Sequence, residues 1–143
     1  MTSQNFATHT RRLPAYHFVV VPLLLLNIVL NVRDLVKAPS LWTLWGSVLA
    51  VTIFLGILLA RTMALTAQDR IIRLEETLRL QRLLPVEQHG EIASITRGQF
   101  IALRFASDAE LPALFQRVRN GEFANPKAIK QAITSWRPDL LRV

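Results

Sequence analysis

Two uninterrupted apolar runs, Phe18–Val32 and Leu41–Ala60, constrain this chain more than any other feature of its sequence. The second run has no charged residue, so as a helix rising 1.5 Å per residue it can cross a hydrocarbon core of about 30 Å. The first run, counted from Tyr16, is close to the shortest length that can cross. Because only Arg33–Ser40 separates the runs, the sequence predicts a transmembrane helical hairpin over residues 16–60.

The remainder of the chain is polar and carries most of its formal net charge of +7. This charge suits the anionic headgroups of lipids, and the basic residues alternate with acidic ones, which disfavours a nucleic-acid surface. We therefore expect an all-α membrane protein in four parts. Residues 1–15 form a polar N-terminal segment, and residues 16–60 form the transmembrane hairpin, with helices at about 16–36 and 41–60. Residues 61–85 form an amphipathic helix, and residues 86–143 form a small three-helix cytoplasmic domain.

The basic residues that flank the runs predict the orientation of the hairpin. The outer ends of the two helices carry Arg11, Arg12, Arg61, Arg70 and Arg73, whereas the connecting loop carries Arg33 and Lys37. The positive-inside rule therefore places both termini in the cytoplasm. A cleaved signal sequence is disfavoured, because the first run is long and no Ala-x-Ala site follows it. The residues expected at the membrane interface are Arg11, Arg12, Tyr16, Trp42, Trp45 and Arg61.

Small and polar residues inside the hairpin predict where helices meet. Asn27 and Asn31 lie four residues apart and share a helix face, and Ser47 or Thr52 could receive a hydrogen bond from them. Pairs of small residues four apart permit a close approach of helices. These features either hold the hairpin together or contact a neighbouring subunit. The predicted helix–helix interface consists of Asn27, Asn31, Gly46, Ala50, Gly56 and Ala60.

His17 is a weak candidate ligand for haem or a pigment, and anchoring at the lipid headgroups is the favoured interpretation. Neither apolar run contains an ionisable residue, so an ion or proton path through this chain alone is disfavoured. Cysteine is absent, which excludes disulfides and thiolate ligands. We expect no metal, and no cofactor other than contacts with bound lipid or pigment.

The segment from Thr62 to Leu84 is polar but periodic. Its apolar positions recur at helical spacing, at Ala67, Ile71, Leu74 and Leu78. Acid-first pairs four residues apart support a helix, which ends before Pro85. These pairs are Asp69–Arg73 and Glu75–Arg79. The second spanning helix either continues through this segment or bends and lies on the membrane.

Helix-capping signals divide the C-terminal part into three short helices. Thr96 caps one that extends to Phe105. Ser107 and Glu110 form a capping box for a second helix, which Gly121 ends. Asn125 and Pro126 open a third helix, which extends to Trp136. We expect a small apolar core from Leu111, Leu114, Phe115, Val118, Ile129 and Ile133.

Motifs of known catalytic mechanisms are missing from the sequence. It contains no phosphate-binding glycine loop, no HExxH and no nucleophile elbow. We interpret the Glu75–Glu76 carboxylates as a solvated helix face, and Asp108 and Glu110 as charges that stabilise a helix N-terminus. We therefore expect no enzymatic activity and no catalytic residue.

Four segments resemble a family of small bacterial two-helix inner-membrane proteins of unknown function. They are Asn5–Arg11, Ala64–Glu75, Ala102–Leu114 and Lys127–Leu141. The resemblance implies a bacterial inner-membrane location, the hairpin and the cytoplasmic helical domain. It implies no substrate, cofactor or catalytic residue.

These observations lead to two functional hypotheses. The first is a non-enzymatic accessory or scaffolding subunit of a larger bacterial inner-membrane complex, which includes energy-transducing and photosynthetic reaction-centre or antenna assemblies. Its partners would be larger membrane-protein subunits and anionic lipids. The alternative is a membrane-tethered module that binds a cytoplasmic protein.

Overall fold

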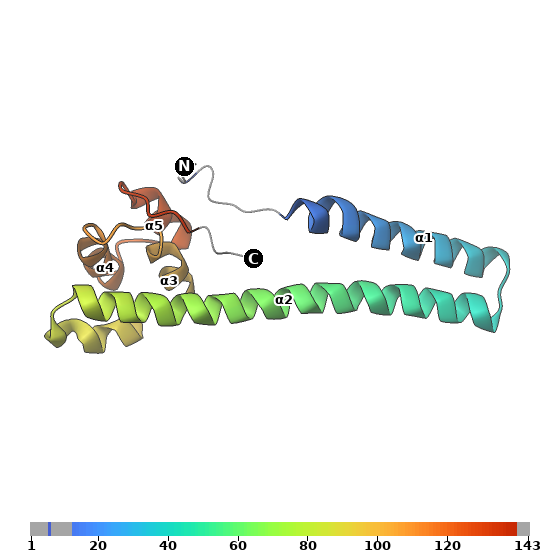
Figure 1. The fold of residues 1–143 in the computed structure, drawn as a ribbon, viewed down its shortest axis with the longest axis horizontal. Helices are drawn as coiled ribbons and strands as arrows, with labels where there is room; N and C mark the ends of the chain where they lie inside the picture. Colours follow the sequence, from blue (N-terminus) through green and yellow to red (C-terminus); the bar gives the residue numbers. More distant parts are fainter. Residues whose placement is uncertain (1–5, 7–12, 140–143) are drawn as a thin grey trace. The chain divides into compact units, whose positions relative to one another are not determined.

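A computed structural model describes Phe6 and residues 13–139 (Figure 1). The described part is all-helical and contains no β-strand, as expected. Its elements are a π-helical turn η1 (Ala15–Val20), α1 (Val21–Lys37), α2 (Leu41–Leu83), a 3₁₀ segment η2 (Val86–Ser94), α3 (Arg97–Leu103), α4 (Leu111–Arg119) and α5 (Pro126–Ala132). The chain divides into two compact units between Leu65 and Thr66, and we describe each unit separately.

The first unit contains η1, α1 and the first part of α2. Pro22 occupies the first turn of α1 and is preceded by the wider turn η1. Because proline has no backbone N–H, a change of hydrogen-bond register at this point is expected. Ser40 and Thr43 cap the start of α2 reciprocally, since the backbone N–H of each donates to the hydroxyl oxygen of the other, at 2.9 and 3.1 Å.

The apolar side chains of this unit remain uncovered. None of the residues from Ala15 to Lys37 is buried, and between Leu41 and Leu65 only Ser47 and Ala50 are. Both helices are long and apolar enough to cross a membrane. A core helix of a soluble protein would instead bury most of such a stretch.

One helix, α2, accounts for two of the expected segments. It continues without interruption from Leu41 to Leu83, so the second apolar run and the periodic segment after it belong to the same helix. The backbone is thus helical through the whole periodic segment, and whether that segment lies on a membrane stays a prediction. The helix ends two residues before Pro85, as the sequence predicts.

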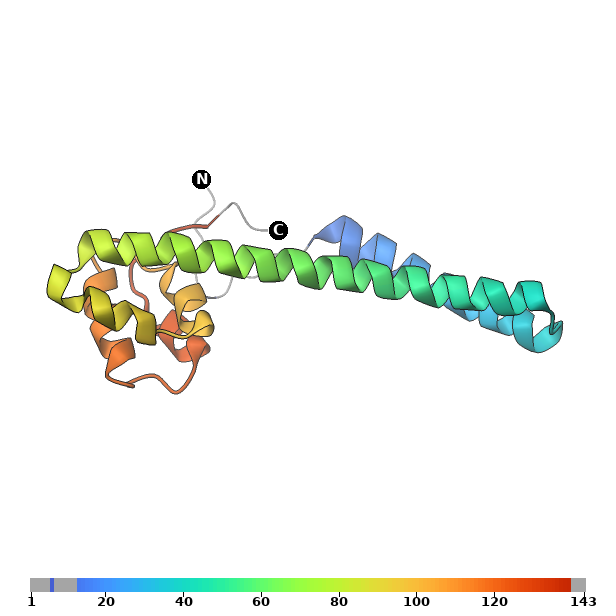
Figure 2. The ribbon, with the colours of Figure 1, turned by 90° about the horizontal axis from the view of Figure 1, so that it is seen from below.

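The second unit is built around one apolar core. The end of α2 contributes Leu80 to it, the next residue after α2 contributes Leu84, and the short helices contribute most of the remainder. Figure 2 shows these short elements gathered at the C-terminal end of α2. The expected core positions of α4 and α5 are all buried, which confirms them. The largest fully buried side chains are Phe100, Phe105, Phe115, Leu80, Leu103, Leu111, Leu114 and Ile129.

Capping explains where the short helices begin. Thr96 and Gln99 form a reciprocal capping box at α3, and the Asn125 side chain accepts a hydrogen bond from the N–H of Ala128 at 3.0 Å. Gly121 ends α4 with a φ of +75°, a conformation that favours glycine. These predicted signals are confirmed, although α3 and α5 are shorter than expected. After α5, the backbone pairs with the loop that follows α3, because the backbone N–H of Ser107 donates to the carbonyl oxygen of Ser135 at 2.9 Å.

The predicted capping box at Ser107 is half wrong. The Ser107 hydroxyl accepts from the N–H of Glu110 at 3.3 Å, but the Glu110 carboxylate does not return to Ser107. It accepts from the backbone N–H groups of Thr134 and Ser135, at 2.9 and 3.0 Å. The helix consequently begins later, at Leu111. Glu110 therefore connects α4 to a distant segment rather than capping its own helix.

Two features of the second unit differ from the sequence analysis. The segment η2 was not expected, because Val86–Ser94 has no helical apolar period. The buried face of α2 is also a different one: Ile72, Glu76 and Leu80 are buried, whereas Ile71 and Leu74 are exposed. This segment of α2 has two faces with apolar residues, and the core packs against the face that has fewer of them.

Candidate functional site

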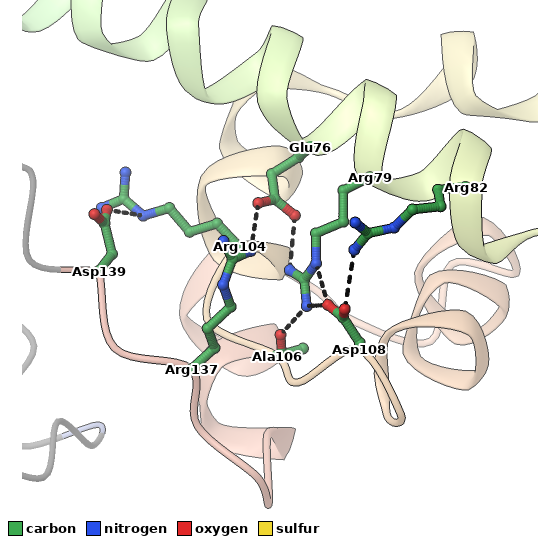
Figure 3. Close-up of polar contacts among 8 residues, drawn as sticks. All are labelled: Glu76, Arg79, Arg82, Arg104, Ala106, Asp108, Arg137 and Asp139. Carbon is green, nitrogen blue, oxygen red and sulfur yellow. Dashed lines mark hydrogen bonds and ion pairs between the residues drawn. The ribbon is translucent and has the colours of Figure 1, made fainter.

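A cluster of charged side chains attaches α2 to the C-terminal helices (Figure 3). We call it the ion-pair cluster. Figure 3 shows that three separate segments contribute to it, namely α2, the loop after α3 and the end of the described chain. Its members are Glu76, Arg79, Arg82, Arg104, the carbonyl of Ala106, Asp108, Arg137 and Asp139.

Arg79 lies at the centre of the ion-pair cluster. Its Nε donates to Oδ1 of Asp108 at 2.7 Å, and its Nη1 donates to Oε2 of Glu76 at 3.0 Å. Its Nη2 donates to the carbonyl oxygen of Ala106 at 2.6 Å. All three guanidinium nitrogens are thus used, which is the multidentate geometry that makes arginine suitable for buried pairing.

The two carboxylates bound to Arg79 experience opposite environments. Burial raises the pKa of Glu76, and the neighbouring charges of Arg79 and Arg137 oppose that effect. The hydrogen bond from Arg79 lowers the pKa of the exposed Asp108. The prediction that Glu76 belongs to a solvated face is therefore wrong. Asp108 binds two α2 arginines, because Nη2 of Arg82 also donates to it at 3.0 Å.

The cluster continues toward the end of the described chain. Nη1 of Arg137 lies 3.5 Å from Oε1 of Glu76, and Nε of Arg104 lies 3.3 Å from Oδ2 of Asp139. The Arg104 guanidinium also stacks over the ring of Phe105, 4.6 Å from its centre. Each pair joins residues that are far apart in sequence, so the cluster acts as a clamp on the domain.

The expected i,i+4 ion pairs of α2 take other partners. Arg79 pairs with Glu76 and Asp108, not with the predicted Glu75. The carboxylate of Asp69 lies 3.8 Å from Arg97. The sequence could not reveal these partners, because a separation of 29 residues between Arg79 and Asp108 leaves no local pattern. Among the described residues, no group of three or more His, Asp or Glu side chains could hold a metal ion.

In the hairpin unit, the side chain of Asn31 lies against Gly46. A β-carbon placed on Gly46 would be 2.7 Å from Oδ1 of Asn31, whose Nδ2 donates to the carbonyl oxygen of Asn27 at 2.9 Å. The hydroxyls of Ser47 and Thr52 instead donate to carbonyls of their own helix, of Thr43 and Val48. The backbone of Gly46 is thus the neighbour of the asparagine face.

The other predicted interface residues occupy different surroundings. Ala50 is buried. Gly56 and Ala60 are exposed, and a β-carbon on Gly56 would meet nothing within 4 Å. Gly56 and Ala60 therefore do not pack inside this unit, and their prediction as an interface with a neighbouring subunit is untested.

The described members of the predicted membrane-interface set lie near the ends of the hairpin unit. Trp42 and Trp45 are exposed in the first turns of α2. The Arg61 guanidinium lies over the Tyr16 ring, 5.6 Å from its centre. Arg11 and Arg12 are outside the described residues. Nδ1 of the exposed His17 lies 2.9 Å from the carbonyl oxygen of Leu13, and its role as a haem or pigment ligand stays a prediction.

Comparison with known proteins identifies the family without assigning an activity. A family model described as "Family of unknown function (DUF6526)" matches residues 1–143, so the chain belongs to this family. Searches of the curated proteins and of the solved structures found no match.

Proposed function

We propose that this member of a family of unknown function is a non-enzymatic accessory or scaffolding subunit of a larger bacterial inner-membrane complex. In this proposal α1 and the first twenty residues of α2, Leu41–Ala60, form a transmembrane hairpin. The C-terminal unit lies in the cytoplasm and offers surfaces to neighbouring subunits and to anionic lipids.

The exposed apolar helices support a membrane location. About 30 Å of apolar helix over Leu41–Ala60 matches the hydrocarbon thickness of a bilayer. In water, an uncovered apolar surface of this extent would aggregate. Trp42 and Trp45 then lie at the membrane surface opposite the cytoplasm, and the arginines that follow Ala60 lie on the cytoplasmic side.

The continuity of α2 is the observation that carries the proposal. One unbroken helix contains both the apolar segment and the residues Glu76, Arg79 and Arg82, to which the domain is clamped. The helix that contains the apolar segment therefore also provides the side chains that the domain binds. The ion-pair cluster uses its buried charges to hold the domain in place, which suits a structural role better than a chemical one.

Co-purification from native membranes tests this proposal. We would tag the chain, extract it in mild detergent, and identify its companions by mass spectrometry and by an absorption spectrum. We expect a stoichiometric set of membrane subunits, and the spectrum shows whether the complex holds pigment. A stable species that contains this chain alone would contradict the proposal.

A matched pair of variants makes the test sharper. Arg79→Ala removes the buried centre of the ion-pair cluster, whereas Arg82→Ala removes an exposed partner of the same Asp108. If the companions contact the clamped domain, Arg79→Ala should lose them and Arg82→Ala should retain them. Loss of the companions in neither variant would place the contact on the hairpin instead.

The compact core of residues 66–139 favours a second candidate function, a membrane-tethered module that recruits a cytoplasmic protein. The core contains Leu80 of α2 and Leu84 directly after it, so the binding domain would include the end of that helix. A soluble protein as the main companion in the same purification would support this alternative.

A further inference from the structure

α2 has an apolar face that the described part of the chain leaves uncovered. Ile71, Leu74 and Leu78 are 56, 61 and 58% exposed. At 3.6 residues per turn, these positions lie on the side of α2 opposite Glu76 and Leu80, which contact the C-terminal domain. The domain therefore covers one side of α2 and leaves the other side exposed.

Ala67 continues this face, because it lies four residues before Ile71 and is also exposed. We call the four exposed residues Ala67, Ile71, Leu74 and Leu78 the α2 stripe. It extends for about 17 Å along the helix.

Two charged residues flank the stripe with a spacing typical of paired helices. Arg70 precedes Ile71, and Glu75 follows Leu74; neither makes an ion pair within the described residues. In a parallel helix pair, the residue before one core position faces the residue five further along in the other helix. Arg70 of one copy would thus face Glu75 of a second copy, twice in a two-fold dimer.

The orientation and position of the stripe also favour a second copy. This argument rests on the membrane hairpin proposed above: two copies inserted in one membrane share the same orientation, so their α2 helices run in the same direction. The segment between Ala60 and Leu74 contains four charged residues, so the stripe is not expected in the apolar layer of that membrane. In an antiparallel pair, Arg70 would face Arg70 and Glu75 would face Glu75.

We propose that the α2 stripe pairs with the same stripe of a second copy, which forms a parallel homodimer with reciprocal Arg70–Glu75 ion pairs. The dimer goes beyond the accessory role proposed above, and it forms with or without other subunits. Co-purification can therefore find no other subunit although the dimer is present. It can also find other subunits although the dimer is absent.

Disulfide cross-linking tests this pairing cleanly, because the chain has no cysteine of its own. Leu74→Cys lies on the stripe, and the exposed Arg73→Cys lies on the same turn of α2 but off the stripe. We would oxidise native membranes that contain each full-length variant and identify the products by non-reducing gel and mass spectrometry. A disulfide needs β-carbons within about 4.5 Å, so we expect several times more dimer with Leu74→Cys.

Equal cross-linking of the two variants, or none, would overturn the proposal. A Leu74→Cys product with a different protein would also overturn it and would assign the stripe to another subunit. A lipid-sensitive dye on the same cysteine separates the remaining possibility: an emission typical of the bilayer interior would mean that the stripe lies in the membrane, and would overturn the dimer.

Charge reversal tests the parallel register. In the Leu74→Cys background, Arg70→Glu should lower the cross-linked fraction by roughly fivefold, because two attractive pairs become repulsive. Adding Glu75→Arg should restore the original fraction, since the pairs are then reversed but complementary. Failure of the first change to lower the fraction, or of the second to restore it, would contradict reciprocal Arg70–Glu75 pairs.

Discussion

At the scale of single residues, Arg79 and Arg82 make the clearest comparison. They lie nearly one turn apart on α2 and bind the same Asp108, but the side chain of Arg79 is 6% exposed and that of Arg82 is 69% exposed. Removal of a buried partner leaves uncompensated charge in a medium of low dielectric constant. Removal of an exposed partner leaves groups that water can solvate.

We therefore predict very different effects from the two alanine variants. Arg79→Ala should lower the free energy of unfolding of the C-terminal unit by about 3–5 kcal/mol. Arg82→Ala should lower it by about 1 kcal/mol or less. Urea titration of the full-length protein in mild detergent measures both effects. Fluorescence of Trp136 reports on this unit if Trp42 and Trp45 are replaced by phenylalanine, and similar losses in both variants would contradict the prediction.

The lowered pKa of Asp108 predicts a dependence of stability on pH. Because the folded state favours the ionised carboxylate, its stabilisation is complete above the pKa of an unfolded aspartate, about 4. It is lost as the pH falls through the lower pKa of the folded state. Asp108→Asn should thus be less stable than the unchanged protein at pH 7, and the difference should shrink in acid.

Glu76→Gln supplies a control of opposite sign for the same titration. Burial raises the pKa of Glu76, so ionisation of this group opposes folding as the pH rises through the raised value. The stability of Glu76→Gln relative to the unchanged protein should improve over that range. A constant difference between Asp108→Asn and the unchanged protein at all pH values would contradict the assignment of Asp108.

At the scale of helices, local signals in the sequence were sufficient to locate most of the fold. The apolar runs gave the hairpin helices, and Thr96, Asn125 and Pro126 gave helix starts, because caps act within one turn. The faces of α2 were not predictable in the same way. Ile72 and Leu80 form a sparser stripe than Ile71, Leu74 and Leu78, and only tertiary contacts determine which stripe the domain covers.

The candidate site was missed for a related physical reason. Glu76 and Arg79 are charged residues on a helix rich in charge, and a solvated surface is their usual environment. Their burial depends on Asp108 and on the carbonyl of Ala106, which arrive from another part of the chain. The periodicity of α2 cannot predict contacts with residues that are distant in sequence. These ion pairs could therefore be identified only in the structure.

The close approach of Asn31 to Gly46 predicts that a larger side chain at position 46 destabilises the hairpin. Gly46→Ala would place a β-carbon 2.7 Å from Oδ1 of Asn31, so the Asn31 amide must shift, which we expect to weaken its hydrogen bond to Asn27. Gly56→Ala is the matched control, because that position is open. Helix propensity alone should favour both alanines by up to about 1 kcal/mol.

We expect Gly46→Ala to weaken the hairpin and Gly56→Ala to leave it unchanged or slightly more stable. Titration with a denaturing detergent, followed by energy transfer between probes on α1 and α2, measures the difference. Asn31→Ala should remove the penalty of Gly46→Ala, since the obstructing oxygen is then absent. Equal destabilisation by both alanines would contradict a specific contact between Asn31 and Gly46.

At the scale of the whole chain, two kinds of surface have separate roles in the proposed function. In that proposal, lipid covers the apolar surface of α1 and of Leu41–Ala60, and seven charged side chains form the clamp between α2 and the C-terminal helices. The α2 stripe is the apolar surface that neither lipid nor the domain covers, which is why we assign it to a second copy. A membrane orientation with the C-terminal unit in the cytoplasm underlies all of these assignments.

Labelling of single cysteines in intact cells tests that orientation most directly. Ala38→Cys lies in the turn between α1 and α2, and Ala124→Cys lies in the exposed loop after α4. With a maleimide that does not cross the inner membrane, we predict that Ala38→Cys is labelled in intact cells and Ala124→Cys only after lysis. Labelling of Ala124→Cys in intact cells, or of both positions only after lysis, would contradict a transmembrane hairpin with a cytoplasmic domain.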